Sequence, residues 1–378
     1  MNYKLIATAA AGVEGVTKKE LYALGCNNVT AINGKLHYEG DETLIAKSNL
    51  HLRTADKVLI VLFEKKVFTF DELFDAAISF PWEDILDKKG KYIVNGKSAK
   101  SKLFAESSIQ SIIKKAIIER LTKAYKTSFF PENGTEYHID FNFFEDTLTV
   151  SLNTSGAPLH KRGYRDLLGA APLRETLAAC MVLLSGWKGE KPLIDPFCGS
   201  GTIPIEAALI AMNIPAGFNR NFACENYSFL PSVMAEEKER AAEGILTGIP
   251  YKISGFDIDP AAIKLSLRHA KNAKTDNIHF QTQELTKLSS RFPVGTIITN
   301  PPYGERLLDK EKADELYRSL RKVYDGLSNW DLFLITTAQD FERTFGKRAD
   351  RTRRLFNAKK ECRLFQYISK QPAVTVNN

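Results

Sequence analysis

The chain has 378 residues, more than one typical domain contains, so we expect two or three domains. With 44% hydrophobic and 26% charged residues it is typical of a globular, soluble protein, and no apolar run is long enough to span a bilayer. The five cysteines are scattered without a C-x-x-C pair, and the six histidines form no H-x-x-x-H pair. This usage predicts a cytoplasmic protein with no disulfide frame, no metal site and no membrane partner.

The formal net charge of +7 is concentrated in three basic runs, at residues 97–126, 159–165 and 343–363. A single basic run is usually a solvated face of a protein. Three runs on one chain, two of them with aromatic residues interleaved, favour a polyanionic partner, and nucleic acid is the leading candidate. The last run holds nine basic residues against Asp350 and Glu361.

The first 65 residues alternate short strand-like segments with a helix-like stretch, GVTKKELYALG, that Gly25 closes, which predicts an α+β module. Beyond it, the spacing of isoleucines predicts a long amphipathic helix over 105–125. A hairpin is expected around Glu145–Asp146, because both of its arms alternate polar and apolar residues. A stretch rich in Gly and Pro, 156–170, then reads as a linker.

After this linker, helix-like and strand-like runs alternate to the end, which predicts a doubly wound α/β domain with a largely parallel sheet. Its first strand ends at Asp195 and leads through Gly199 and Gly201 into a helix. Glycines at the carboxyl end of a strand let the backbone approach a ligand closely. The third glycine of a dinucleotide fingerprint and the Gly-Lys-Ser/Thr of a phosphate loop are both missing. We therefore expect a nucleotide-like ligand without a pyrophosphate, and a tight strand–helix turn that binds no ligand is the less favoured alternative.

The second strand ends in Asp257 and Asp259, after an insertion over residues 213–248. An acid at this strand end suits ribose hydroxyls. Asp259 could equally cap the helix that begins at Pro260, so Asp257 is the stronger candidate. The third strand ends at Gln283–Glu284, where polar groups could contact an adenine edge or belong to an ordinary loop.

The fourth strand ends in TIITNPPYGERL. Pro301 restricts Asn300 to an extended conformation, so the amide oxygen of Asn300 and the carbonyl of Pro301 can be held as two acceptors. Tyr303 offers a ring on which a flat base could stack. These three residues suit a clamp for the exocyclic amino group of a base, because two acceptors favour the localised lone pair that attacks an electrophile.

In this order, DPFCGSGT, GFDID and NPPYGERL resemble the class I S-adenosylmethionine-dependent amino-methyltransferases. More narrowly, PLHKRGYR, APLRETLAA and NIPAGFNRNFACENY resemble the THUMP-domain RNA guanine-N2 methyltransferases, over nearly the whole chain. The resemblance implies a ferredoxin-like domain (1–65), a THUMP domain (66–155), the linker (156–170) and a seven-stranded Rossmann-like methyltransferase domain (171–378).

Site residues are carried over by position from the same resemblance. It implies that Asp195 and the Phe197–Gly201 loop line the methionine part of the cofactor and that Asp257 takes the ribose hydroxyls. Glu284 stands near the adenine, where the family usually has Asp. The base-binding motif matches at Asn300, Pro301 and Tyr303. The basic run 159–165 supplies the candidate RNA contacts His160, Lys161, Arg162, Tyr164 and Arg165.

The sequence thus predicts an enzyme that moves a methyl group from S-adenosylmethionine to the N2 amine of a guanosine, with 23S rRNA as the leading substrate. A tRNA guanosine, an adenine N6 amine in RNA or DNA, and a glutamine in a protein remain alternatives that use a similar clamp. A non-catalytic RNA-binding assembly factor is the alternative from a different class. The oligomeric state is not predicted.

Overall fold

A computed structural model describes residues 1–166, 173–275, 277–302, 310–358 and 360–369. It divides into two compact units. The first unit contains residues 1–8, 20–159 and 221–239, and the second contains 9–19, 160–220 and 240–378. The chain therefore passes between the units within the N-terminal module and within the insertion, and not only at the predicted linker.

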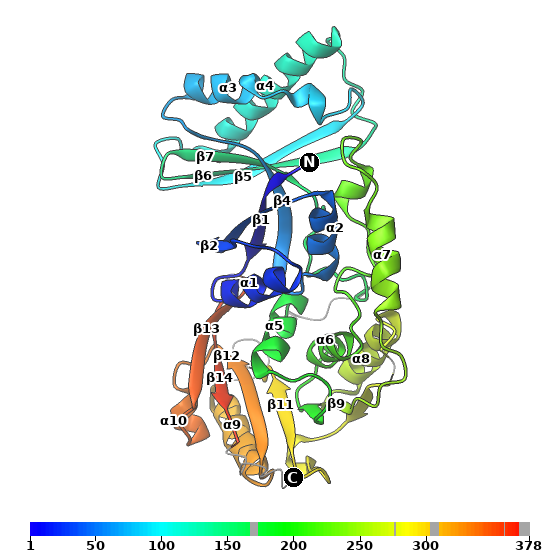
Figure 1. Cartoon of the computed structure of the whole chain (residues 1–378). Coiled ribbons are helices and arrows are strands. Elements are labelled where there is room, and N and C mark those ends of the chain that lie inside the picture. The colour runs from blue at the N-terminus through cyan, green and yellow to red at the C-terminus, as the bar shows by residue number, and fades with distance from the viewer. Residues whose placement is uncertain (167–172, 276, 303–309, 359, 370–378) are drawn as a thin grey trace. The chain divides into compact units, whose positions relative to one another are not determined.

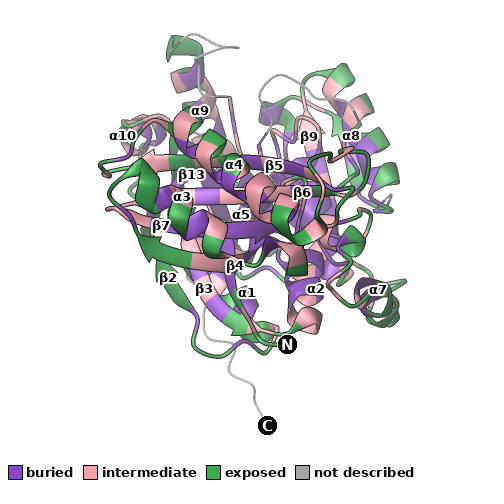
Figure 2. Ribbon diagram, turned by 90° about the horizontal axis from the view of Figure 1, so that it is seen from above, coloured by how far each residue is buried: buried purple, intermediate pink, exposed green. Residues whose placement is uncertain are grey.

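The first unit is built on one seven-stranded sheet in the order β2-β3-β1-β4-β7-β6-β5. Long β4 joins the ferredoxin-like strands to the later ones, because its residues 59–66 pair antiparallel with β7, from Leu59↔Asn153 to Lys66↔Thr147. The edge strand β2 is exposed at all three of its residues (Figure 2). The strands are β1 (Tyr3–Ala9), β2 (Thr30–Ile32), β3 (Lys35–Gly40), β4 (Ala55–Lys66), β5 (Lys91–Ala99), β6 (Glu136–Phe144) and β7 (Thr147–Asn153).

Two helices cover one face of β5, β6 and β7 in this unit (Figure 1). The predicted amphipathic helix is confirmed as α4, whose buried residues recur at helical spacing (Ile109, Ile113, Ala116, Ile117, Leu121). The predicted hairpin is confirmed as β6–β7, with Glu145 and Asp146 both at positive φ. Among residues 1–159, the helices that lie wholly in this unit are α2 (Glu42–His51), α3 (Phe70–Ser79), the one-turn η1 (Trp82–Asp84) and α4 (Glu106–Tyr125), whereas α1 (Glu14–Ala23) is divided, with residues 14–19 in the second unit.

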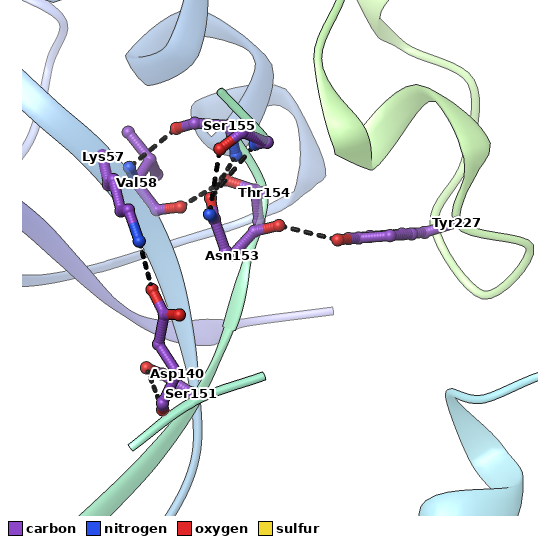
Figure 3. A network of polar contacts seen from close by, with 9 residues as sticks. Lys57, Val58, Asp140, Ser151, Asn153, Thr154, Ser155 and Tyr227 are labelled. Carbon is purple, nitrogen blue, oxygen red and sulfur yellow. Dashed lines mark hydrogen bonds and ion pairs between the residues drawn. The ribbon is translucent and has the colours of Figure 1, made fainter. Parts of the chain in front are cut away.

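The insertion contributes residues 221–239, with η2 (Ala223–Asn226) and most of α7 (Met234–Glu243), to the first unit. Its Tyr227 ring stacks on Tyr137, with centroids 5.0 Å apart. The Tyr227 hydroxyl donates to the carbonyl oxygen of Asn153 at 2.7 Å (Figure 3). In the same network, the hydroxyl of Ser155 accepts from the Val58 N–H at 2.8 Å. The segment is therefore fastened to the end of β7.

The second unit contains the predicted seven-stranded sheet, in the order β10-β9-β8-β11-β12-β14-β13. Strands β8 to β12 run parallel, and β14 and β13 join antiparallel at one edge. The strands are β8 (Leu193–Asp195), β9 (Ile253–Asp257), β10 (His279–Thr282), β11 (Gly295–Thr299), β12 (Trp330–Thr336), β13 (Arg351–Asn357) and β14 (Lys360–Tyr367).

Helices cover both faces of this sheet. Successive residues of a strand point to opposite faces, so neighbouring residues pack in different cores. Ile298 and Phe333 pack in the core under α5, α6 and α8, whereas Ile297 and Leu332 pack in the core under α9 and α10. The doubly wound prediction is therefore confirmed. The helices are α5 (Glu175–Ser185), α6 (Thr202–Ala211), α8 (Pro260–Asn272), the one-turn η3 (Leu285–Lys287), α9 (Lys310–Asp325) and α10 (Phe341–Phe345).

Within the described ranges, no helix has the length and apolarity needed to cross a membrane. The same residues contain no cluster of three or more His, Cys, Asp or Glu side chains that could hold a metal ion.

Candidate active site

The candidate site lies where the strand order of the second unit reverses. The chain builds β8, β9 and β10 toward one edge and then returns to place β11 on the other side of β8. Ile297 of β11 pairs with Ile194 of β8, so the two strands end within one residue of the same level. Ligands of open α/β sheets bind at this switch point, beyond the carboxyl ends of the strands. The candidate residues Asp195, Asp257 and Asn300 all lie at this edge.

Asp195 is buried at the end of β8, with 1% of its surface exposed. One of its oxygens, Oδ1, accepts hydrogen bonds from the Phe197 N–H at 3.1 Å and from the Thr299 hydroxyl at 2.7 Å. The pKa of Asp195 is raised to about 7, chiefly by burial and to a smaller degree by the nearby Asp257, while the two donors act to lower it. Among the described residues, no donor bonds to the other oxygen, Oδ2.

The glycine loop after β8 runs in the left-handed region at two positions, Gly199 (φ +52°) and Gly201 (φ +81°). A Cβ added at Gly201 would lie 2.8 Å from Ser266 Cβ and 3.0 Å from Phe280 Cζ, so this glycine is needed for packing against α8 and β10. A Cβ at Gly199 would meet no atom of the described part of the chain within 4 Å. Open space therefore lies beside the Gly199 backbone, as a close ligand requires.

Asp257 and this loop hold each other in place. The Gly199 N–H donates to Asp257 Oδ2 at 2.9 Å, and the Asp259 N–H donates to Asp257 Oδ1 at 3.0 Å. Asp259 caps α8 by accepting from the Ala261 N–H at 2.8 Å. The structure therefore gives Asp259 the capping role that the sequence left open, and leaves Asp257 facing the loop.

The third strand is shorter than its sequence suggests, because β10 ends at Thr282. The Gln283 N–H donates to the Asp257 carbonyl oxygen at 2.9 Å, which joins the ends of β10 and β9. Glu284 follows at the start of η3 with an exposed side chain. Its predicted contact with an adenine remains a prediction.

The loop residues next to Asp195 differ in exposure. Phe197 is half-buried and packs against the core under α9. Cys198 is buried, and its N–H donates to the Phe256 carbonyl at 2.9 Å. Burial raises the pKa of the Cys198 thiol, so this thiol stays protonated and is a poor nucleophile.

Asn300 follows directly on β11, where Thr299 is fully buried and bonded to Asp195. Asn300 is half-buried and Pro301 is buried. The strand end that carries the amide is therefore fixed to the strand end that begins the glycine loop. The third residue of the predicted clamp, Tyr303, lies outside the described residues.

The candidate RNA contacts of the run 159–165 divide into two groups. Three of them are held by acids inside the second unit. Arg162 and the Tyr164 hydroxyl both lie at Glu206 of α6, at 3.5 and 3.1 Å, and Arg165 pairs with Glu175 of α5 at 3.2 Å. These side chains are almost fully buried, which corrects the expectation that they face RNA. For the exposed Lys161 and the half-buried His160, contact with RNA remains a prediction.

Sequence reasoning missed two contacts that hold the glycine loop. Arg165 also donates to the Thr202 hydroxyl in the first turn of α6. His269 of α8 places its Nδ1 atom 3.1 Å from the Ser200 carbonyl, and burial lowers the pKa of this imidazole. A loop fixed from both sides in this way is preorganised for a ligand.

Three family models match the chain. One described as an RMKL-like methyltransferase domain matches residues 162–366, one described as an RlmL ferredoxin-like domain matches 4–59, and the THUMP domain matches 67–153. These matches confirm the predicted order of a ferredoxin-like module, a THUMP module and a methyltransferase domain.

Several relatives match this chain over nearly its whole length. A Bacillus subtilis (strain 168) protein named "Putative RNA methyltransferase YpsC" is 38% identical over 97% of this chain and 96% of its own length. The crystal structure of "SMU.472, a putative methyltransferase complexed with SAH" is 39% identical, covers 98% of this chain and 99% of that one, and has a TM-score of 0.93. A structure from Listeria monocytogenes, titled a predicted N6-adenine-specific DNA methylase, is 40% identical over 98% of this chain and 97% of its own, with a TM-score of 0.92.

Proposed function

This chain belongs to the family with the RMKL-like methyltransferase domain, and from that premise we propose that it methylates the exocyclic N2 amine of a guanosine in 23S rRNA, in the cytoplasm, with S-adenosylmethionine as its cofactor. The observation that carries the proposal is the joining of two strand ends at the switch point. The glycine loop after β8 and Asn300 after β11 meet through the Thr299–Asp195 hydrogen bond.

The residues at this edge suit the proposed cofactor. Open space beside Gly199 leaves room for a ligand against the backbone. Asp195 and Asp257 offer oxygen atoms that can accept hydrogen bonds from an ammonium group and from ribose hydroxyls. A solved relative holds SAH, which is the product left when S-adenosylmethionine has given up its methyl group.

The protein's own part in the chemistry is to hold and polarise the amine. In this proposal the amide oxygen of Asn300 and the Pro301 carbonyl accept hydrogen bonds from the two amine hydrogens. The lone pair then localises on nitrogen and points toward the methyl group. When bound, S-adenosylmethionine would supply an activated methyl group, and its sulfur would keep the electron pair of the carbon–sulfur bond. The methylated amine loses its extra proton to water, so no base from the protein is required. The main task of the protein is then to orient the two reactants.

RNA as the substrate is supported by the module that precedes the catalytic domain. The THUMP model matches 67–153, and the B. subtilis relative is named an RNA methyltransferase. A base inside a duplex cannot reach a clamp at a sheet edge, so we propose that the target nucleotide is unpaired or flipped out.

The name of the Listeria relative favours a second candidate, transfer to the N6 amine of adenine, since the same clamp accepts that amine. One experiment separates the candidates. The protein is incubated with methyl-labelled S-adenosylmethionine and with separate pools of 23S rRNA, tRNA and DNA, and the nucleosides are identified by mass spectrometry. N2-methylguanosine in the 23S rRNA supports the proposal, whereas N6-methyladenosine in any pool supports the second candidate. A protein that binds no cofactor would be an assembly factor instead.

A further inference from the structure

A pair of arginines faces each other across β13 and β14, at the antiparallel edge of the second-unit sheet. Arg354 is directly opposite Arg363 in the register, and both are exposed. Like charges directly opposite each other on neighbouring strands destabilise a sheet. Arg354 pairs with Glu361 at 2.6 Å. Within the residues that the structure describes, no carboxylate pairs with Arg363.

This pair lies at the catalytic edge of the sheet. Arg363 pairs with Thr336, the last residue of β12, and Leu334 of β12 pairs with Thr299 of β11. The position of Asn300 therefore falls within about one residue of the level of Arg363, two strands away. With strands spaced about 4.8 Å apart, the two backbones are separated by roughly 10 Å, and the Arg354 backbone lies about 14 Å from Asn300.

The charge around the pair is strongly positive. Five basic residues and one acidic residue occupy the described part of 351–363, the basic ones being Arg351, Arg353, Arg354, Lys360 and Arg363 and the acidic one Glu361. The Arg354 guanidinium also lies over the Phe356 ring, 5.2 Å from its centroid. One planar guanidinium group can bind two oxygens of a phosphate at once, so this cluster suits the phosphates of an RNA backbone.

A simpler explanation is that charges protect an exposed sheet edge from pairing with other chains. It fails for Arg363, because β14 is paired on both sides, with β12 and with β13. The edge strand is also covered near Arg354. A Cβ added at Gly12 would lie 2.2 Å from the Arg354 carbonyl oxygen, and Arg353 donates to the Gly12 carbonyl at 3.2 Å.

We propose that Arg354 and Arg363 bind backbone phosphates of the substrate RNA next to the nucleotide whose base enters the site at Asn300. The inference rests on the proposed function, since it takes RNA as the substrate. It adds an anchor within the catalytic unit that holds the flanking backbone while the base is presented. An anchor at this distance would position the target nucleotide without touching the amine.

The test is RNA affinity as a function of salt, measured by filter binding with protein-free 23S rRNA and the whole 378-residue chain. Arg363→Gln and Arg354→Gln should each weaken binding and lower the slope of log affinity against log salt by about one. Arg363→Lys keeps the charge and should retain the slope. Arg343→Gln is the matched control, because Arg343 belongs to the same basic run but lies on α10 and not on β13 or β14, and it should bind RNA like the parent.

A structural role would give a different pattern. Removing one of two opposed like charges should leave the melting temperature unchanged or raise it, so a variant that binds RNA poorly yet melts normally supports the anchor. Unchanged salt slopes in both Gln variants, or an equal loss in Arg343→Gln, would overturn it. The methylated nucleoside made by the parent is measured separately. If the Gln variants lose RNA affinity as expected but the parent makes no N2-methylguanosine, the proposed function is contradicted. If the parent makes N2-methylguanosine but the salt slopes of both Gln variants are unchanged, only the anchor is contradicted.

Discussion

The Thr299 hydroxyl donates to Asp195 Oδ1 at 2.7 Å, which joins the strand end before Asn300 to the strand end before the glycine loop. Both residues are almost fully buried, so water does not compete for this bond. A shift of either strand end would change the distance between the amine clamp and the cofactor side of the site. Groups at this edge therefore set the geometry of the proposed site, and substitution of each should have a distinct effect.

Asp195 should make the stability of the protein depend on pH. Its pKa is raised in the folded state, from 3.8 to about 7, so the folded protein holds this proton more tightly than the unfolded chain does. The stabilisation is complete below about pH 4 and is lost as the pH rises through about 7. The free energy of unfolding of the parent minus that of Asp195→Asn should therefore fall between pH 4 and 7. A difference that does not change over this range would contradict the raised pKa.

Asp257 and Asp259 form a matched pair for cofactor binding. Asp257→Ala should weaken S-adenosylmethionine binding in calorimetry, because it removes the proposed acceptor of the ribose hydroxyls and the partner of the Gly199 N–H. Asp259→Ala should cost about 1 kcal/mol of stability through loss of the α8 cap and leave the cofactor affinity unchanged. The opposite pattern would assign the cofactor contact to Asp259.

The two glycines of the loop should fail in different ways when they are changed to alanine. Gly201→Ala should destabilise the fold, since its Cβ would overlap Ser266 and Phe280. Gly199→Ala adds its methyl group to open space, so the fold should lose only the roughly 1–2 kcal/mol of a left-handed alanine while cofactor binding weakens. Melting temperature and calorimetric affinity, measured together, check both. Full cofactor affinity in a folded Gly199→Ala protein would mean that the space is not the cofactor site.

The basic run 159–165 should separate into structural and RNA-contacting residues. Tyr164→Phe removes the hydrogen bond to Glu206 and should cost about 1 kcal/mol of stability without changing RNA affinity. Lys161→Ala should keep the stability and lower the salt slope of RNA binding by about one. Chemical denaturation and filter binding give the two quantities. A large loss of RNA affinity in Tyr164→Phe would restore the sequence-based expectation for that residue.

Local pattern was enough to predict the parts of the fold that rest on periodicity. The amphipathic helix α4, the β6–β7 hairpin and the glycine loop after β8 were all readable, since each depends on residues close together in sequence. Helix α2 was missed, although Asp41 caps it by accepting from the Leu44 N–H at 2.9 Å. An acid before a short apolar run was the signal that could have found it.

What the sequence could not reveal depends on distant partners. Arg162 reads as a surface cation until Glu206, 44 positions later, is known to lie beside it. Tyr227 reads as part of a catalytic-domain insertion, yet it stacks on Tyr137 in the first unit. The Thr299–Asp195 bond spans 104 positions. Charge and aromatic content alone do not tell a buried pair from an exposed one, because burial is decided by the tertiary fold.

The central claim is that Asn300 clamps the amine that receives the methyl group. Asn300→Ala should keep the melting temperature, the cofactor affinity and most of the RNA affinity of the parent, because the amide is proposed to contact one amino group. By analogy with the loss of one preorganised contact to a developing charge, the rate of methyl transfer should fall about a hundredfold or more. Tyr303→Ala, which removes a proposed stacking face, should weaken productive RNA binding as well, by about 1–3 kcal/mol.

The most direct measurement is the single-turnover rate of methyl transfer to 23S rRNA by Asn300→Ala, with the cofactor saturating so that product release does not limit the rate. We predict a loss of about a hundredfold or more with normal cofactor binding. A rate equal to that of the parent would mean that the end of β11 is only structural, and the amine clamp would have to be abandoned.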